Sequence, residues 1–198
     1  MGKLYNQNEK NRYSPYIGGL GDILHGAHLK TAVFGNSDVE EELIRVSALI
    51  PMDSRGLIDY GNLDNILIED IDYPYGFKTD YEKILTELAK IKEDISLILI
   101  DTGDLYRLNI YGDFLSSDVF EQKRNMIITD IDNFIGDLKT KIEGENSLLM
   151  VVSPNRAEER IDGSKLTPIV LWGKDIEKGV LTSSTTNKKG IVTNLDIS

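Results

Sequence analysis

Four apolar runs without polar alternation form the strongest pattern in this chain. They occupy residues 29–34, 97–100, 148–152 and 168–171, and a helical or long connection separates each from the next. Continuous apolar runs are typical of parallel strands that are covered on both faces. The pattern predicts that the four runs share one mostly parallel sheet, with residues 96–100 as a central strand.

Helical periodicity fills most of the space between these runs. Residues 118–142 are expected to form the longest helix, because apolar side chains recur there at intervals of seven, four, three and four residues. These side chains are Phe120, Ile127, Ile131, Phe134 and Leu138. Thr79 and Glu82 have the spacing of a capping box, which predicts a second amphipathic helix starting there.

Shorter elements complete the expected fold. Residues 16–27 and 39–45 are predicted helices, with Ser37 or Asp38 as the N-cap of the second. Residues 47–51 and 57–60 are predicted strands, and residues 64–76 a loop or sheet edge. Strands alternating with helices indicate an α/β protein, and we expect a three-layer α/β/α sandwich. With no repeat or linker in view, residues 1–198 are expected to form a single domain.

Composition narrows the possible partners. The net charge is −11, and nucleic-acid binding needs clustered Lys and Arg, so a nucleic-acid partner is not expected. The same charge disfavours adhesion to an anionic membrane. The chain has no cysteine, which excludes a thiolate nucleophile or a cysteine zinc site. No apolar run approaches the ~20 residues of a membrane span, so this chain is expected to be soluble.

Polar side chains follow the predicted strands. The carboxyl ends of parallel strands meet at one edge of a sheet, so a cleft is expected there. The alternative is that these residues are simply good turn and cap residues. The candidate cleft residues are Asn36, Asp38, Asp53, Asp101, Asp104 and Asn155.

The pair Asp101 and Asp104 is the most specific of these candidates. Two carboxylates after a buried strand can hold a hard cation such as Mg²⁺ or Ca²⁺, here expected to bind weakly. They can equally cap the helix that starts at Leu105, and Arg107 is placed to pair with one of them. In a capping role alone, Asp104→Ala would cost about 1 kcal/mol. No catalytic residue is assigned, and His25 and His28 are expected to have surface or loop roles.

Several segments resemble the alkaline phosphatase superfamily. These are LGDILHGAHLKTAVFGNSD, LILIDTGDLYRL, LMVVSPN and LTPIVLWG. The resemblance implies that Asp104 matches the aspartate of the first metal site, whereas Leu108 stands in place of its histidine. Pro154 and Asn155 stand where the family has an Asp-His metal pair, and no histidine follows His28.

The resemblance therefore implies the scaffold of that family with most metal ligands replaced. We expect a divergent, non-catalytic domain that acts as a binding or sensing module for a small molecule or a protein. The alternative is a metal-dependent phosphohydrolase or phosphomutase whose nucleophile lies outside this chain. The likeness is greatest to bacterial proteins with an extracytoplasmic domain tied to membrane helices. The chain is accordingly expected to be part of a longer, membrane-attached protein.

Overall fold

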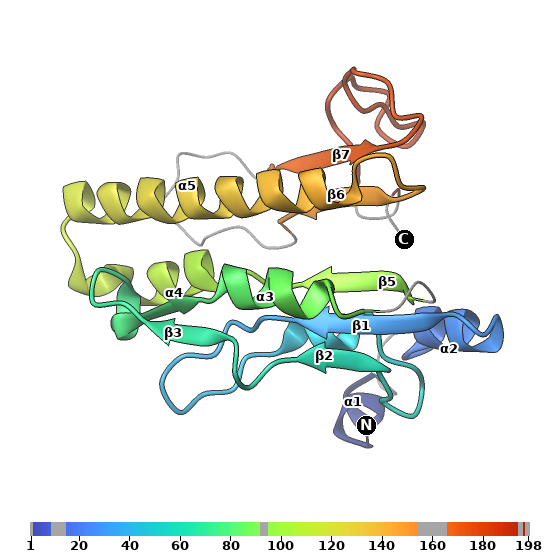
Figure 1. Ribbon diagram of the computed structural model, residues 1–198, viewed down its shortest axis with the longest axis horizontal. Coiled ribbons are helices and arrows are strands. Elements are labelled where there is room, and N and C mark those ends of the chain that lie inside the picture. Colours follow the sequence, from blue (N-terminus) through green and yellow to red (C-terminus); the bar gives the residue numbers. More distant parts are fainter. Residues whose placement is uncertain (1, 9–14, 92–94, 154–165, 194–195, 197–198) are drawn as a thin grey trace. The chain divides into compact units, whose positions relative to one another are not determined.

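The computed structural model describes residues 2–8, 15–91, 95–153, 166–193 and 196 (Figure 1). The chain divides into two compact units, Met1–Leu138 and Lys139–Ser198. It is a mixed α/β protein with a mostly parallel three-stranded sheet in the first unit. A single domain over the whole chain stays a prediction.

The parallel sheet has the strand order β2-β1-β5. Its strands are Lys30–Phe34 (β1), Tyr60–Asn62 (β2) and Ile95–Ile100 (β5), and both neighbours run parallel to β1. The expectation that residues 96–100 form a central strand is wrong, because β1 occupies the centre. The side chains of β1 from Thr31 onward are buried, whereas Ile98 of β5 is 41% exposed. An apolar run shows that a segment is hydrophobic, but it does not show whether the strand lies at the centre or at the edge of the sheet.

A second, antiparallel sheet starts within residues 64–76, which were expected to be loop or edge, and is completed just after them. Leu67–Glu69 (β3) pairs with Phe77–Thr79 (β4), and the 3₁₀ turn Pro74–Gly76 (η2) precedes β4. Tyr75 has a positive φ of 62°, which is uncommon for a residue with a side chain. The short strands escaped prediction because three residues carry too little pattern.

Five α-helices accompany these strands within the described residues. They are Gly2–Asn8 (α1), Gly19–Gly26 (α2), Tyr81–Leu88 (α3), Asp104–Tyr111 (α4) and Ser117–Ile142 (α5). The expected start of α3 needs correction: Thr79 belongs to β4, and the N-cap is Asp80, whose carboxylate accepts a hydrogen bond from the Lys83 N–H at 2.9 Å. None of the described helices is long and apolar enough to cross a membrane.

The predicted stripe on α5 is confirmed as a packing surface. Phe120, Ile127, Phe134 and Leu138 are buried. Phe120 and Ile127 form a core cluster with Tyr73 and Leu108, and Ile131 packs against it. The Phe134 ring stacks on Tyr81 of α3, with centroids 4.6 Å apart.

Two further sequence predictions between β1 and β2 are wrong. Residues 39–45 form no helix: the chain turns back, Val39 and Glu42 exchange backbone hydrogen bonds, and the Asp38 carboxylate accepts from the Ile44 N–H at 2.7 Å. The carboxylate thus binds the returning strand-like segment instead of capping a helix. In place of a strand over residues 47–51, the structure has the 3₁₀ helix Val46–Leu49 (η1).

The second unit contains Leu148–Val152 (β6) and Ile169–Gly173 (β7), which form an antiparallel two-stranded sheet of their own. The prediction that these runs share a parallel sheet with β1 and β5 is therefore wrong. Both strands were found at nearly the expected residues, but an apolar run specifies neither its partner nor its direction. Lys139 lies over the ring of Trp172 in this unit, 5.2 Å from its centroid.

Candidate functional site

Four of the candidate residues gather at the carboxyl edge of the β2-β1-β5 sheet. Asn36, just after β1, is only 1% exposed. Its side-chain NH₂ donates to the Leu63 carbonyl oxygen at 2.6 Å, and its Oδ1 accepts from the Asp38 N–H at 3.0 Å. Asn36 therefore joins the chain leaving β1 to the chain leaving β2.

Asp101 makes the corresponding link between β1 and β5. Its Oδ1 accepts from the Ser37 hydroxyl at 3.0 Å and from the Gly103 N–H at 3.1 Å. The Asp101 N–H donates to the Phe34 carbonyl oxygen at 2.8 Å. Its side chain is half-buried. Asp101 is thus a turn residue that still reaches solvent.

Asp104 is the most deeply integrated of the four, at 1% exposure. Its Oδ1 accepts from the Thr79 N–H at 2.9 Å, and its Oδ2 accepts from the Tyr81 hydroxyl at 2.7 Å. It is the first residue of α4, and the N-cap position is Gly103. The capping interpretation therefore needs correction: the carboxylate joins α4 to β4 and α3. Burial and the Asp104 carboxylate both raise the pKa of Tyr81.

Arg107 balances the charge of Asp104. Its guanidinium is fully buried, and Nη2 lies 2.7 Å from Asp104 Oδ1 and 2.8 Å from the Thr79 hydroxyl. Nη1 donates to the Asn36 carbonyl oxygen at 3.1 Å. The pairing expected from the sequence is confirmed. A guanidinium therefore supplies the positive charge at the carboxyl edge of this sheet.

This arrangement bears on the cation that Asp101 and Asp104 were expected to hold. Both oxygens of Asp104 already accept hydrogen bonds, and its counter-charge is Arg107. Within the part of the chain that the structure describes, no group of three or more His, Asp or Glu side chains is placed to hold a metal ion. Weak binding of Mg²⁺ or Ca²⁺ at Asp101 and Asp104 stays a prediction.

Asp38 serves the loop after β1. Its carboxylate accepts from the Ile44 N–H and from the guanidinium of Arg45, whose Nη2 lies 2.9 Å from Oδ2. Arg45 also reaches Asp64 at 2.7 Å, and these two carboxylates raise its pKa. The loop between β1 and η1 is thereby fastened to the chain that follows β2.

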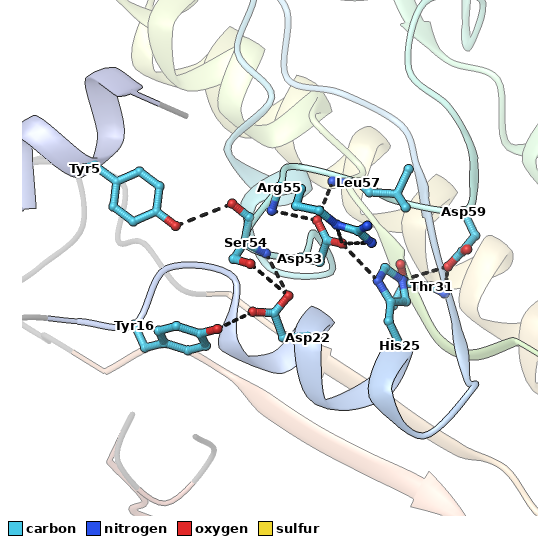
Figure 2. Close-up of polar contacts among 10 residues, drawn as sticks. All are labelled: Tyr5, Tyr16, Asp22, His25, Thr31, Asp53, Ser54, Arg55, Leu57 and Asp59. Carbon is cyan, nitrogen blue, oxygen red and sulfur yellow. Dashed lines mark hydrogen bonds and ion pairs between the residues drawn. The ribbon is translucent and has the colours of Figure 1, made fainter.

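Asp53 does not join this group, contrary to the expectation that it lies at the same edge. Its carboxylate instead contacts Arg55, Leu57 and His25 (Figure 2). It is 1% exposed, and its Oδ1 accepts from the N–H groups of Arg55 and Leu57 at 2.9 and 2.8 Å. Its Oδ2 accepts from the Arg55 guanidinium at 2.8 Å. Because the preceding residues form η1 and not a strand of the sheet, nothing delivers Asp53 to the carboxyl edge.

His25 is a residue of this second cluster that the sequence reasoning missed. Its Nδ1 lies 3.3 Å from Asp53 Oδ2, and its Nε2 lies 2.9 Å from Asp59 Oδ2 (Figure 2). Asp59 in turn accepts from the Thr31 N–H at 2.8 Å, at the amino end of β1. The two carboxylates are 28 and 34 positions away along the chain, so no local pattern could reveal them.

A neighbouring set of polar contacts ties the N-terminal segments to the same loop. Asp22 of α2 accepts from the Ser54 N–H and hydroxyl at 3.1 and 3.0 Å and from the Tyr16 hydroxyl at 2.5 Å (Figure 2). The hydrogen bond from Tyr16 lowers the pKa of Asp22 most, followed by those from Ser54. The Tyr5 hydroxyl of α1 donates to the Ser54 carbonyl oxygen at 3.4 Å. These contacts tie α1, α2 and the residues before α2 to the loop at Ser54, and they do not form a nucleophile–base arrangement.

Asn155, the remaining candidate, lies outside the described residues, as does Pro154. Its predicted place near Asp104 therefore stays a prediction.

Acid is expected to weaken the fold partly through Asp53. The Leu57 N–H and the Arg55 side chain hold the pKa of Asp53 well below its ordinary value of 3.8. A lowered pKa stabilises the folded state above the unfolded pKa, and this contribution is lost as the pH falls below about 4. Asp53→Asn should therefore be less stable than the natural chain at pH 5, and the difference should shrink towards pH 3. Urea unfolding of both proteins at each pH measures this difference in stability. A difference that stays constant between pH 5 and pH 3 would contradict the lowered pKa of Asp53.

The chain was compared with protein-family models, with curated proteins and with solved structures. No protein-family model, no curated protein and no solved structure matches it. Its function therefore has to be inferred from its own residues.

Proposed function

We propose that this chain is a divergent alkaline-phosphatase-like domain that acts as a non-catalytic binding module. The observation that supports it most is the buried pair of Asp104 and Arg107. The resemblance assigns the Asp104 position to a metal ligand. In this chain the carboxylate instead accepts hydrogen bonds from Arg107, Thr79 and Tyr81.

The chemistry of phosphate-ester hydrolysis explains why this pair matters. Two-metal phosphatases use cations to stabilise both the attacking and the leaving oxygen, so their carboxylates must face the metals. A buried guanidinium can balance a carboxylate permanently, but it cannot generate a hydroxide nucleophile. The pair keeps the strand ends connected and does not supply that chemistry.

The three-layer α/β/α arrangement of the superfamily belongs to the same proposal. Its support is the parallel β2-β1-β5 sheet with polar residues at its carboxyl edge. A sensing role and an extracytoplasmic location follow from the resemblance alone and are proposed on that basis.

The contacts at the strand ends also indicate where the module does not bind its ligand. Asn36, Asp104 and Arg107 are buried, and their polar groups are directed at neighbouring elements. Buried networks of this kind fix the relative positions of the elements. We therefore regard this edge as a rigid support and look for the binding surface elsewhere in the first unit.

A metal-dependent phosphohydrolase or phosphomutase is the alternative. The observation that favours it is Asp101, which is half-buried and accepts both of its hydrogen bonds through Oδ1. A nucleophile from outside this chain would then act beside a cation at Asp101.

An aryl-phosphate turnover assay with added Zn²⁺, Mn²⁺ or Mg²⁺ separates the two functions. We expect turnover no faster than the metal-containing buffer, for the natural chain and for Asp101→Asn alike. Asp101 is the better position for the variant, because loss of Asp104 would disturb the buried pair. Metal-dependent turnover that disappears in Asp101→Asn, with an unchanged circular dichroism spectrum, would contradict the proposed binding module. It would support the metal-dependent phosphohydrolase or phosphomutase.

A further inference from the structure

A continuous set of aromatic rings lies where η2, β4 and α4 meet. Tyr75 contacts the rings of Phe77 and Tyr111, with centroids 6.3 and 5.1 Å apart. Tyr111 in turn contacts Phe114, at 5.4 Å, in the 3₁₀ turn Gly112–Phe114 (η3). Together with Ile71, these four rings are called the aromatic surface below.

Two side chains of the aromatic surface are largely exposed, and the other three are half-buried. Phe114 is 77% exposed and Ile71 is 93% exposed. Single exposed apolar side chains are common, but a contiguous group marks an interaction site more often than chance. Tyrosine and phenylalanine are also enriched at the centres of protein interfaces.

A hollow of about 420 Å³ adjoins these rings. It is lined by Glu69, Asp70, Ile71, Tyr75, Gly76 and Phe77, so its lining combines aromatic and acidic side chains. Tyr75 takes part in it with a positive φ of 62°. A non-glycine residue held in that region stores backbone strain, and such residues cluster at ligand-binding sites. The unusual backbone conformation of Tyr75 in the η2 turn therefore helps to form the hollow.

The charge around the aromatic surface is negative. Glu69 lines the hollow and is exposed, and burial, followed by the charge of Glu40, raises the pKa of Tyr75. Lys78 lies 3.1 Å from Asp70 and 3.8 Å from Asp130, and Lys123 donates to the Asp72 carbonyl oxygen at 2.5 Å. These two cations offset part of the negative charge and leave Glu69 and Glu40 to act on a partner.

This charge decides which partner fits. A second copy of the chain also carries a net charge of −11, so its acidic side chains would be repelled by those around the aromatic surface. A basic partner gains from the same field, and its cations can also lie over the exposed ring of Phe114. The apolar part of the surface requires that this partner carry apolar side chains as well.

We propose that the aromatic surface binds a basic segment of a partner protein in which Lys or Arg alternates with apolar side chains. The apolar side chains contact Phe114 and Ile71, and the cations lie near Glu69 and over the ring of Phe114. This inference rests on the proposed function as a binding module and names its class of partner.

The test uses a fluorescein-labelled peptide in which Lys alternates with Phe and Leu, and a matched peptide with Glu in place of each Lys. Fluorescence anisotropy with the whole chain measures Kd at low and at raised salt. We expect the basic peptide to bind, the acidic peptide not to bind, and salt to weaken binding. The double variant Phe114→Ser, Ile71→Ser should raise Kd about tenfold or more. Glu69→Lys should raise it several-fold and reduce the effect of salt.

Two matched controls keep the test specific. Ile23→Ser removes a side chain that is 72% exposed on α2, which precedes the amino end of β1. Asp137→Lys makes the same charge change as Glu69→Lys, but on an exposed residue of α5 that does not line the hollow. Both should change Kd less than about twofold.

Equal binding of the two peptides, or equal weakening by the control and surface variants, would overturn the inference. Those results would leave the proposed function standing, since metal-dependent turnover is what contradicts that function. Circular dichroism of each variant ensures that a lost contact, and not a lost fold, is being measured.

Discussion

Replacing Asp104 by alanine is expected to lower the free energy of unfolding by about 3–5 kcal/mol. The change leaves the fully buried guanidinium of Arg107 without its carboxylate. It also removes the acceptor for the Tyr81 hydroxyl and the Thr79 N–H. Since whole domains are stable by only about 5–15 kcal/mol, this loss should be plain in urea unfolding.

The control is Asp101→Ala, which removes a half-buried carboxylate from the same sheet edge and should cost only about 1 kcal/mol. The double variant Asp104→Asn, Arg107→Met should lose less than the sum of its two single variants, because the buried charges depend on each other. A loss of only about 1 kcal/mol for Asp104→Ala is what a helix cap alone would give, and it would contradict the assigned role.

Gly35→Ala is expected to be the second severe substitution, at roughly 3 kcal/mol or more. Gly35 follows β1 with a φ of +80°, and an added Cβ would lie 1.9 Å from the Asp101 carbonyl oxygen. That atom is backbone and cannot rotate away, so β1 and β5 would have to separate at their carboxyl ends. Thermal or urea unfolding of the variant measures the effect.

Gly136→Ala provides the matched control. Gly136 lies within α5, and a Cβ added there meets no atom within 4 Å. Alanine in a helix interior is favoured over glycine by about 1 kcal/mol, so this variant should be slightly more stable than the natural chain. If both alanine variants shifted stability alike, the close approach of Gly35 and Asp101 would not be the cause.

Local patterns in the sequence predicted the principal elements well. The stripe on α5 and the apolar runs of β1, β5, β6 and β7 appear at nearly the expected residues. These features depend on side chains a few positions apart, which the order of residues displays directly. The short strands β3 and β4 were missed because three residues carry too little pattern.

The candidate site was predicted in part, for the same reason. Asn36, Asp38, Asp101 and Asp104 do gather at one sheet edge, because parallel strands deliver their carboxyl ends together. Asp53 does not, because the segment before it is η1 and not a strand of that sheet. The sequence placed Asp104 beside Arg107 through helical spacing, yet it could not show that both are buried.

By itself the sequence determined the long helix α5, the apolar strands β1, β5, β6 and β7, and which polar residues follow β1 and β5. Only the tertiary structure decided the partners: β6 with β7 in a separate sheet, Asp104 with Tyr81 and Thr79, and His25 with two distant carboxylates. The physical reason is burial. A strand edge or a charged group removed from water must find a hydrogen-bond partner, and which one it finds depends on the packing of residues far apart along the chain.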